Sequence, residues 1–466
     1  MISRVLVANR GEIAVRIIRA CQEAGLETVA VYSEADAGAR HVTLADRAVR
    51  IGGPRPGESY LRAEALVQVA LAVGADALHP GYGFLAESAH LAQLCADNGI
   101  TFVGPSAEII DQLGDKVNAR RIAVDAGVPV VEGTGDQPAT EEDLLALGER
   151  QGYPILIKAA AGGGGRGMRI IRTPEEVRGN LEDAQREALA AFGSDVIFGE
   201  CYLERIRHIE VQIVGDHSGN VVHVGTRDCS VQRRYQKIVE EGPATAIDPE
   251  LRARIEADAV RLMASMGYVG AGTVEFVVDM TRGTHHFIEV NTRIQVEHPV
   301  SEMTSGIDLV REQLRVANPE QRLSFTQDDV QLRGVAIELR INAEDAMNGM
   351  MPSPGTITAL QLPGGPGIRV DTHCVVGTTI SPYYDSMIAK IIVHDDDRES
   401  ARRRAIRALS ETRIDGVTTN IPFLVRVLEH ANYEANVFHT KWLEEQMSSI
   451  LQVMESTTAA EAEGAR

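Results

Sequence analysis

The stretch ISRVLVANRGEIAVRIIRACQEAGLETVAVYS, residues 2–33, carries the pattern that decides the fold class. Residues 2–8 are mostly apolar and predict a short buried strand. Residues 12–25 have helical spacing that ends at a glycine, and residues 26–33 form a second strand-like run. Strand, helix and strand in this order predict a parallel βαβ unit.

The same alternation continues to about residue 114. Helical segments at 61–73 and 86–98 alternate with the strand-like runs ADALHP and ITFVGP. We therefore expect residues 1–114 to form a doubly wound parallel sheet, in which ligands bind in loops after the strand ends. The loop HPGYGFLAE is one candidate, although a simple tight turn also explains it. A dinucleotide fold, and with it a dehydrogenase, is disfavoured because the turn NRGEIA has one glycine where that fingerprint needs three.

The pattern then becomes mixed and antiparallel, which predicts an α+β domain over residues 115–330. It includes the strand-like runs GVPVVEG and YPILIKAA, and helical segments at 140–151, 174–192 and 249–267.

A third, mostly β domain is predicted over residues 331–445, with helices at 398–411 and near 421–430. The small and acidic residues of 446–466 predict a flexible, frayed or disordered tail.

Composition excludes several classes of function. A chain of 466 residues is too long for one compact core, and its formal net charge of −20 disfavours nucleic acid and anionic membranes as partners. No apolar run approaches the roughly 20 residues of a membrane-spanning helix, and the N-terminus has no secretory pattern. Five scattered cysteines without a CxxC pair indicate reduced thiols, a cytoplasmic location and no zinc site.

Lysine is rare in this chain, because arginine carries almost all of the positive charge. The only lysines are Lys116, Lys158, Lys237, Lys390 and Lys441. A lysine is a compact point charge suited to single phosphate oxygens, whereas arginine offers a planar fork. We expect Lys116, Lys158 and Lys237 to be functional, because each lies in a polar or glycine-rich setting.

Four consecutive glycines follow a strand-like run in KAAAGGGGRGM, residues 158–168. Glycine lets backbone N–H groups close on an anion without interference from a Cβ atom. Ordering each glycine costs about 1–2 kcal/mol, so the run suits a mobile lid that closes over a bound phosphate. A flexible hairpin tip is the alternative, and the run matches neither a P-loop nor a kinase loop.

The segment HFIEVNTRIQVEH, residues 286–298, alternates with a period of two. If it is extended, one face packs into the core and the other presents Glu289, Asn291, Arg293, Gln295 and Glu297. A carboxylate and an amide two residues apart can share Mg²⁺ with substrate phosphates, and Glu275 could add a ligand from a neighbouring strand. An exposed strand face is the alternative.

Two further polar segments are less specific. RHIEVQ, residues 207–212, alternates but is equally consistent with an exposed strand. RDCSVQRRYQK, residues 227–237, is a basic island that could hold phosphate or a bicarbonate-derived anion, or could be a solvated charge cluster.

Together with VLVANRGEIAVRIIRA, GDK, KIVEE, GAGTVEF, ELRINAED and SPYYDSMIAK, these segments resemble the biotin carboxylase family of the ATP-grasp superfamily over about residues 1–445. The resemblance implies an N-terminal preATP-grasp domain, a central ATP-grasp domain with a lid at about 131–204, and a C-terminal domain. It implies a ligase that uses ATP, Mg²⁺ (or Mn²⁺) and bicarbonate to carboxylate biotin through carboxyphosphate.

The resemblance also implies roles for individual residues. Lys116 and Lys158 would bind ATP phosphates, with Gly163, Gly164 and Gly165 in the lid. Glu200 and Leu203 would meet adenine, and His208, Gln232 and Lys237 would line the nucleotide and bicarbonate pocket. Glu275, Glu289 and Asn291 would ligate the metal. Arg293, Gln295 and Val296 would hold bicarbonate, Glu297 would be its base, and Tyr82 and Arg340 would contact biotin; Glu297, Arg293, Arg340 and Lys237 form the implied catalytic set.

Two residues depart from the family pattern. Cys201 replaces a basic residue after Glu200, and Tyr235 replaces a histidine that is common there. Backbone contacts at residue 201 should survive, whereas a side-chain contact to adenine would be lost. The sequence therefore leaves the affinity for the nucleotide open and the expected reaction unchanged.

The resemblance implies partners as well. No lysine is flanked by methionines on both sides, as in a biotin attachment site, and no carboxyltransferase domain follows. We therefore expect a separate biotin carboxyl carrier protein, separate carboxyltransferase subunits and a homodimer. Acetyl-CoA, within fatty acid synthesis, is the expected final acceptor, with propionyl-CoA and pyruvate as alternatives. Another ATP-grasp ligase and an inactive nucleotide-binding regulator are the rival interpretations.

Overall fold

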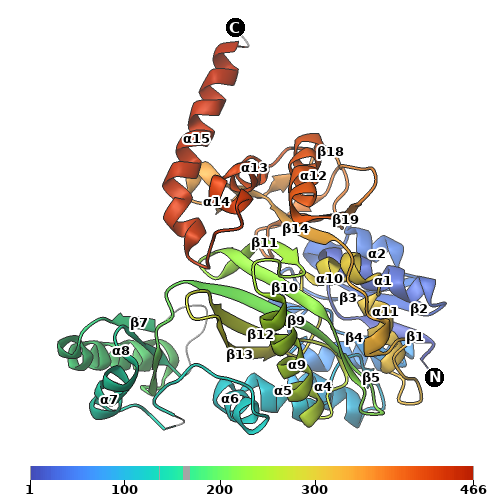
Figure 1. The fold of residues 1–466 in the computed structure, drawn as a ribbon. Helices are drawn as coiled ribbons and strands as arrows, with labels where there is room; N and C mark the ends of the chain where they lie inside the picture. The colour runs from blue at the N-terminus through green and yellow to red at the C-terminus, as the bar shows by residue number, and fades with distance from the viewer. Residues whose placement is uncertain (1, 136, 161–167, 465–466) are drawn as a thin grey trace.

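A computed structural model describes residues 2–135, 137–160 and 168–464 of the chain (Figure 1). Its first part is the expected doubly wound unit. The elements are β1 (Arg4–Val7), α1 (Gly11–Glu23), β2 (Glu27–Ser33), α2 (Arg40–Leu44), β3 (Arg47–Gly52), α3 (Ala63–Val73), β4 (Ala77–His79), α4 (Ala89–Asp97), β5 (Thr101–Phe102) and α5 (Ala107–Gly114).

The five strands are parallel, in the order β3-β2-β1-β4-β5. Successive residues of β1 enter different cores, with Val5 and Val7 in one and Leu6 in the other. The continuous apolar run of β1 is explained by this burial on both faces. The strand order reverses between β1 and β4, so the loops after these two strands open a crevice.

An eight-stranded antiparallel sheet forms the centre of the molecule. Its order is β13-β12-β9-β10-β11-β14-β21-β19. The strands are β9 (Ile206–Gly215), β10 (Val221–Arg233), β11 (Gln236–Gly242), β12 (Gly270–Asp279), β13 (Thr284–Asn291), β14 (Val335–Asn342), β19 (Ile368–Thr372) and β21 (Met387–Asp395). The sheet therefore continues across residue 330, where the sequence predicts a domain boundary.

Helices α9 (Pro249–Ser265), α10 (His298–Ser305) and α11 (Leu309–Val316) pack on this sheet, and α6 (Lys116–Asp125) contacts its edge strand β13. A smaller lobe to the left in Figure 1 contains the antiparallel sheet β7-β6-β8 with two helices. Its elements are α7 (Glu141–Gln151), β6 (Ile155–Ala159), β7 (Met168–Ile171), α8 (Val177–Phe192) and β8 (Ile197–Cys201). The lobe has its own apolar core and lies in the region expected to be the lid.

The C-terminal part adds helices to the end of the large sheet. They are α12 (Arg398–Glu411), α13 (Ile421–Glu429), α14 (Ala431–Glu434) and α15 (Trp442–Gly464), and α15 projects from the body in Figure 1. Small two-stranded sheets are formed by β15 (Glu344–Asp345) with β16 (Met351–Pro352), β17 (Gly355–Thr356) with β20 (Thr379–Ile380), and β18 (Ala359–Gln361) with β22 (Arg413–Asp415). Within the described part of the chain, no helix has the length and apolar character needed to cross a bilayer.

Two expectations about secondary structure are wrong. The run GVPVVEG is not a strand, because it makes only isolated bridges from Val130 to Phe287 and from Gly133 to Glu200. The tail expected from residue 446 begins as ordered helix, because Ile450 and Met454 belong to the C-terminal core and α15 packs on α13. Tertiary packing overrides the small and acidic composition at these positions.

We expect Phe423→Ala to lower the free energy of unfolding of the C-terminal part by about 3–5 kcal/mol, because a large core side chain is lost. Phe423 is fully buried in the core that also contains Trp442, the single tryptophan. Urea unfolding followed by Trp442 fluorescence measures the effect. Val437→Ala, at a side chain that is 55% exposed, is the control and should change stability by less than about 0.5 kcal/mol. Equal effects of the two substitutions would contradict the assigned core.

Candidate active site

Charged side chains from five segments meet over the middle of the eight-stranded sheet. Lys237 of β11 lies at the centre, where its ammonium is 2.7 Å from Glu297 and 3.4 Å from Glu275 and is also hydrogen-bonded to Glu210. Burial opposes the positive charge of Lys237, but these three carboxylates raise its pKa well above the ordinary value. The ammonium therefore stays charged and holds three strongly buried acids together.

Glu297, in the turn before α10, lies between two cations. One carboxylate oxygen accepts from Lys237, and the other lies 2.9 Å from the guanidinium of Arg340. Burial would raise the pKa of Glu297, but the charges of Lys237 and Arg340 lower it below the ordinary value. Glu297 is therefore deprotonated at neutral pH, which a general base requires.

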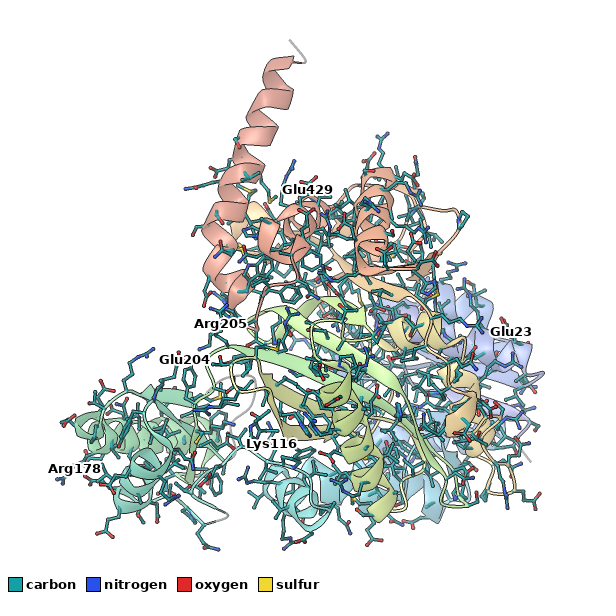
Figure 2. All side chains as sticks on the ribbon, in the orientation of Figure 1. Glu23, Lys116, Arg178, Glu204, Arg205 and Glu429 are labelled. Carbon is teal, nitrogen blue, oxygen red and sulfur yellow. The ribbon has the colours of Figure 1, made fainter. Side chains whose placement is uncertain are left out.

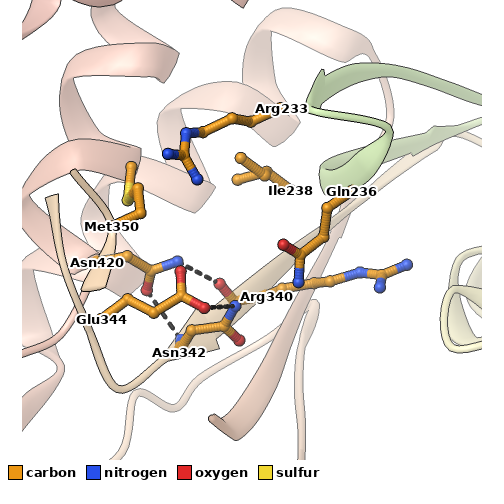
Figure 3. Close-up of a pocket in the computed structure, with 8 residues that line it drawn as sticks. All are labelled: Arg233, Gln236, Ile238, Arg340, Asn342, Glu344, Met350 and Asn420. Carbon is orange, nitrogen blue, oxygen red and sulfur yellow. Dashed lines mark hydrogen bonds between the residues drawn. The ribbon is translucent and has the colours of Figure 1, made fainter. Parts of the chain in front are cut away.

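Arg340 of β14 also donates to Glu240 of β11 over 2.6 Å. Burial raises the pKa of Glu240 to about 7, since the attraction of Arg340 is opposed by the negative charge of Glu297. Arg340 thus holds two carboxylates from different segments. Figure 3 shows its side chain extending away from the small pocket that its backbone lines with Asn342, Glu344 and Asn420.

His208 of β9 is placed between acids, 2.9 Å from Glu275 and 3.4 Å from Glu210. Burial alone would lower its pKa, but these carboxylates raise it to about 10. The ring is therefore an imidazolium at neutral pH. His208, Glu210 and Glu275 thus form a compact ion-paired cluster.

Arg227 is a site residue whose role was not predicted from the sequence. It is completely buried and donates to five side chains, so it cannot hold a phosphate as part of the expected basic island. The acceptors are Glu210, Gln212, Thr273, Gln295 and Ser301. The structural role of Arg227 is thus to hold together, by hydrogen bonds, the strands and the turn around Lys237.

The segment from Glu289 to Glu297 is not one extended strand. The register of β12 and β13 shifts between Glu275 and Phe276, which leaves Ile288 exposed although the alternation places it in the core. A β-bulge explains the change, because an extra residue reverses the faces. The strand then ends at Asn291, and a turn carries the chain on to Glu297.

The turn nevertheless brings the expected residues together. Gln295 donates to Glu275 over 2.8 Å and accepts from Arg227 over 2.7 Å. Arg293 donates to Asn291 over 2.9 Å and lies 3.2 Å from Glu87. The carbonyl of Val296 accepts from the ammonium of Lys390 over 2.7 Å.

Three oxygen-bearing side chains form a suitable setting for a hard cation. Glu275 and Glu289 are cross-strand partners, and Asn291 donates to Glu275 over 2.7 Å. Burial and the negative charge of Glu275 raise the pKa of Glu289. A divalent cation would relieve this repulsion, and the carboxylate and amide oxygens suit Mg²⁺. The residues therefore fit the expected metal.

The residues expected to bind the nucleotide come from the lobe, from the large sheet and from α6. Lys116, labelled in Figure 2, begins α6 and lies 3.5 Å from Glu289. Lys158 of β6 is hydrogen-bonded to Glu200 of β8, and Leu203 follows that strand. Gln232 is paired in register with Lys237. The glycines Gly163, Gly164 and Gly165 lie outside the described residues.

Tyr82 lies at the crevice of the N-terminal sheet, in the loop after β4. Its hydroxyl donates to Glu12 of α1, the helix that follows β1. Glu12 also lies 3.1 Å from the ammonium of Lys390. The loop that carries Tyr82 is thereby connected, through Glu12 and Lys390, to the eight-stranded sheet. This connection lies at the crevice of the N-terminal sheet, where its strand order reverses.

The doubly wound unit, the small lobe and the buried ionic site on an antiparallel sheet define an ATP-grasp enzyme. Family models match along the chain: "Biotin carboxylase, N-terminal domain" at residues 1–110, "Carbamoyl-phosphate synthase L chain, ATP binding domain" at 115–324, and "Biotin carboxylase C-terminal domain" at 338–445.

Individual relatives agree with these matches. Biotin carboxylase 1 of Bacillus subtilis is 50% identical over 444 residues, covering 95% of this chain and 98% of that protein. A pyruvate carboxylase subunit of Methanothermobacter thermautotrophicus is 47% identical, covering 97% and 91%. The crystal structure of the biotin carboxylase domain dimer of Hydrogenobacter thermophilus 2-oxoglutarate carboxylase, in complex with MgADP, ADP and bicarbonate, has a TM-score of 0.90 at 48% identity and covers 97% and 99%.

The chain belongs to the biotin carboxylase family. It is an ATP-dependent carboxylating ligase, which carboxylates biotin with ATP and bicarbonate.

We expect Arg227→Met to lower the free energy of unfolding by about 3–5 kcal/mol, because it leaves buried acceptors and a carboxylate without their donor. Chemical denaturation measures the loss. Arg413→Met is the control: it removes an arginine from an exposed pair with Asp415, which solvent screens, and should lower stability far less than Arg227→Met. A loss at Arg227 as small as that at Arg413 would show that the buried network does not stabilise the sheet.

Proposed function

We propose that the cluster around Lys237 and Glu297 activates bicarbonate and passes its carboxyl group to biotin. The observation that carries this proposal is the buried carboxylate of Glu297, held between the cations of Lys237 and Arg340. Glu297 would take the proton of bicarbonate while a bicarbonate oxygen attacks the γ-phosphorus of ATP and ADP leaves. The cations around it would stabilise the charge that spreads over the transferred oxygens.

The second step uses the product of the first. The ureido nitrogen of biotin would attack the carboxyl carbon of carboxyphosphate as the bond from that carbon to the phosphate oxygen breaks, and the departing phosphate would take the proton of the ureido nitrogen. Arg340 would stabilise the enolate-like oxygen of biotin, since its guanidinium already faces the same turn as the base. Tyr82 would contact biotin from the N-terminal loop.

The remaining residues would bind and orient the substrates. Arg293, Gln295 and the backbone of Val296 would hold bicarbonate, because they lie in the turn that leads to Glu297. Lys116 and Lys158 would bind ATP phosphates, Glu200 and Leu203 would meet adenine, and His208 and Gln232 would line the pocket. Glu275, Glu289 and Asn291 would hold Mg²⁺, which would neutralise phosphate charge when bound.

We propose a homodimer that works with a separate carrier protein and separate carboxyltransferase subunits in the cytoplasm. The dimer of the Hydrogenobacter domain supports the first part, and five cysteines without a disulfide support the location. Acetyl-CoA is the acceptor that we propose. Relatives named for pyruvate and 2-oxoglutarate are nearly as similar as those named biotin carboxylase, so these two acceptors are tested as alternatives beside propionyl-CoA.

The proposal is tested by ADP release from MgATP with and without bicarbonate, each with and without free biotin. Turnover that requires bicarbonate and rises with biotin supports it. ATP cleavage that is indifferent to both rejects the bicarbonate site. Incubation with carrier, transferase and each acyl acceptor then identifies the acceptor by transfer of labelled carboxylate.

We expect Arg340→Ala to keep nucleotide affinity within about twofold but to lower biotin carboxylation by about 10²-fold or more, because a buried oxyanion donor is lost. Calorimetric binding of ATP and biotin-dependent ADP release measure the two properties. Full turnover by this variant would remove Arg340 from the reaction.

A further inference from the structure

Lys390 is a buried lysine to which neither the sequence nor the proposed reaction assigns a role. It lies on β21, directly opposite Arg340 of β14 on one side and Asp371 of β19 on the other. Cross-strand partners share a face of the sheet, so Lys390 and Arg340 point to the same side. Lys390 is 0% exposed. A lysine in such a position needs partners for its charge.

The ammonium of Lys390 has two partners from different parts of the chain. It donates to the carbonyl of Val296 over 2.7 Å and lies 3.1 Å from Glu12. Glu12 in turn accepts from the hydroxyl of Tyr82. One ammonium thus joins the biotin-side loop to the turn that ends at Glu297.

The surrounding charges keep this ammonium protonated. Burial would lower the pKa of Lys390, but the carboxylates of Glu12, Glu338 and Asp371 keep it raised. Burial raises the pKa of Glu338 well above the ordinary value, and among the described residues neither oxygen of that carboxyl group has a hydrogen-bond partner. Asp371 is paired with Arg369 over 2.7 Å. Glu12, whose carboxylate lies 3.1 Å from the ammonium, is the acid in direct contact with Lys390.

We propose that Lys390 is a positioning residue that fixes the bicarbonate-binding turn through the carbonyl of Val296. A hydrogen bond to this carbonyl orients the peptide unit that links Val296 to Glu297, and so sets Glu297 relative to Gln295 and Arg340. The inference rests on the proposed function, because it assigns the turn to bicarbonate. A displacement of the turn by about 1 Å could cost up to about 10²-fold in rate.

The proposal is tested with Lys390→Met, Glu12→Gln and the double variant. We expect Lys390→Met to raise the KM for bicarbonate by about tenfold or more and to leave the KM for ATP within about twofold. The double variant should keep this defect although it leaves no unpaired charge in the Lys390–Glu12 pair. Glu12→Gln alone should raise the KM for biotin, through Tyr82, and leave the KM for bicarbonate within about twofold.

A merely structural role predicts a different pattern. If the double variant regains the bicarbonate KM of the unmodified protein, Lys390 only balances the charge of Glu12 and the proposal is overturned. A tenfold rise of the bicarbonate KM in Glu12→Gln, which keeps the bond to Val296, overturns it as well. If loss of Lys390 prevents folding, the KM for bicarbonate of Glu12→Gln tests the proposal on its own.

Arg398→Met is the matched control. Arg398 is a largely buried cation, with a side chain 12% exposed, and its hydrogen bonds go to Glu241 and to the carbonyls of Tyr433 and Glu434. It should lower stability without changing the KM for bicarbonate, and a tenfold rise there overturns the assignment to Lys390. Turnover of the unmodified protein tests the proposed function separately from the role of Lys390. If that turnover does not depend on bicarbonate, the proposed function itself is rejected.

Discussion

The ammonium of Lys237 among three buried carboxylates is the interaction on which the rest of the site depends. Each acid comes from a different segment, and none could remain ionised in the interior without a cation nearby. Because each buried charge needs its partners of opposite sign, these ion pairs fix how β9, β11, β12 and the turn before α10 lie relative to one another. The charges that stabilise this arrangement also keep Glu297 deprotonated, so the requirements of folding and of base catalysis coincide.

The large sheet continues beyond residue 330, so the ionic cluster around Lys237 also involves a residue of the predicted third domain. Arg340 lies in the predicted third domain, but β14 pairs directly with β11, which carries Lys237 and Glu240. The guanidinium reaches Glu297 because the two strands belong to one sheet. The N-terminal part also contacts the site, through α1 and the loop after β4. All three predicted domains thus contribute to the site, which explains why its residues are so widely spaced in the sequence.

Local patterns predicted what depends on local structure. The βαβ alternation at residues 2–33 predicted the parallel unit, and the setting of Lys237 marked it as functional. The exposure of Ile288 could not be predicted, because a bulge in pairing with β12 reverses the alternation. The run KIVEE shows the same limit: adjacent Glu240 and Glu241 look equivalent, yet one meets Arg340 and the other Arg398. Only the pairing of distant strands distinguishes them.

The distribution of lysine and arginine follows from geometry. Lys237 has carboxylate oxygens on several sides of one nitrogen, and Lys390 has a carbonyl and a carboxylate, which suits a compact ammonium. Arg227 instead spans five separate acceptors, and Arg340 joins two carboxylates, which suits a wide planar fork. Lys441 also has a specific partner, the hydroxyl of Tyr202, beside the proposed adenine segment. In a chain that otherwise uses arginine, Lys237 and Lys390 thus stand where one nitrogen must serve acceptors that converge on a point.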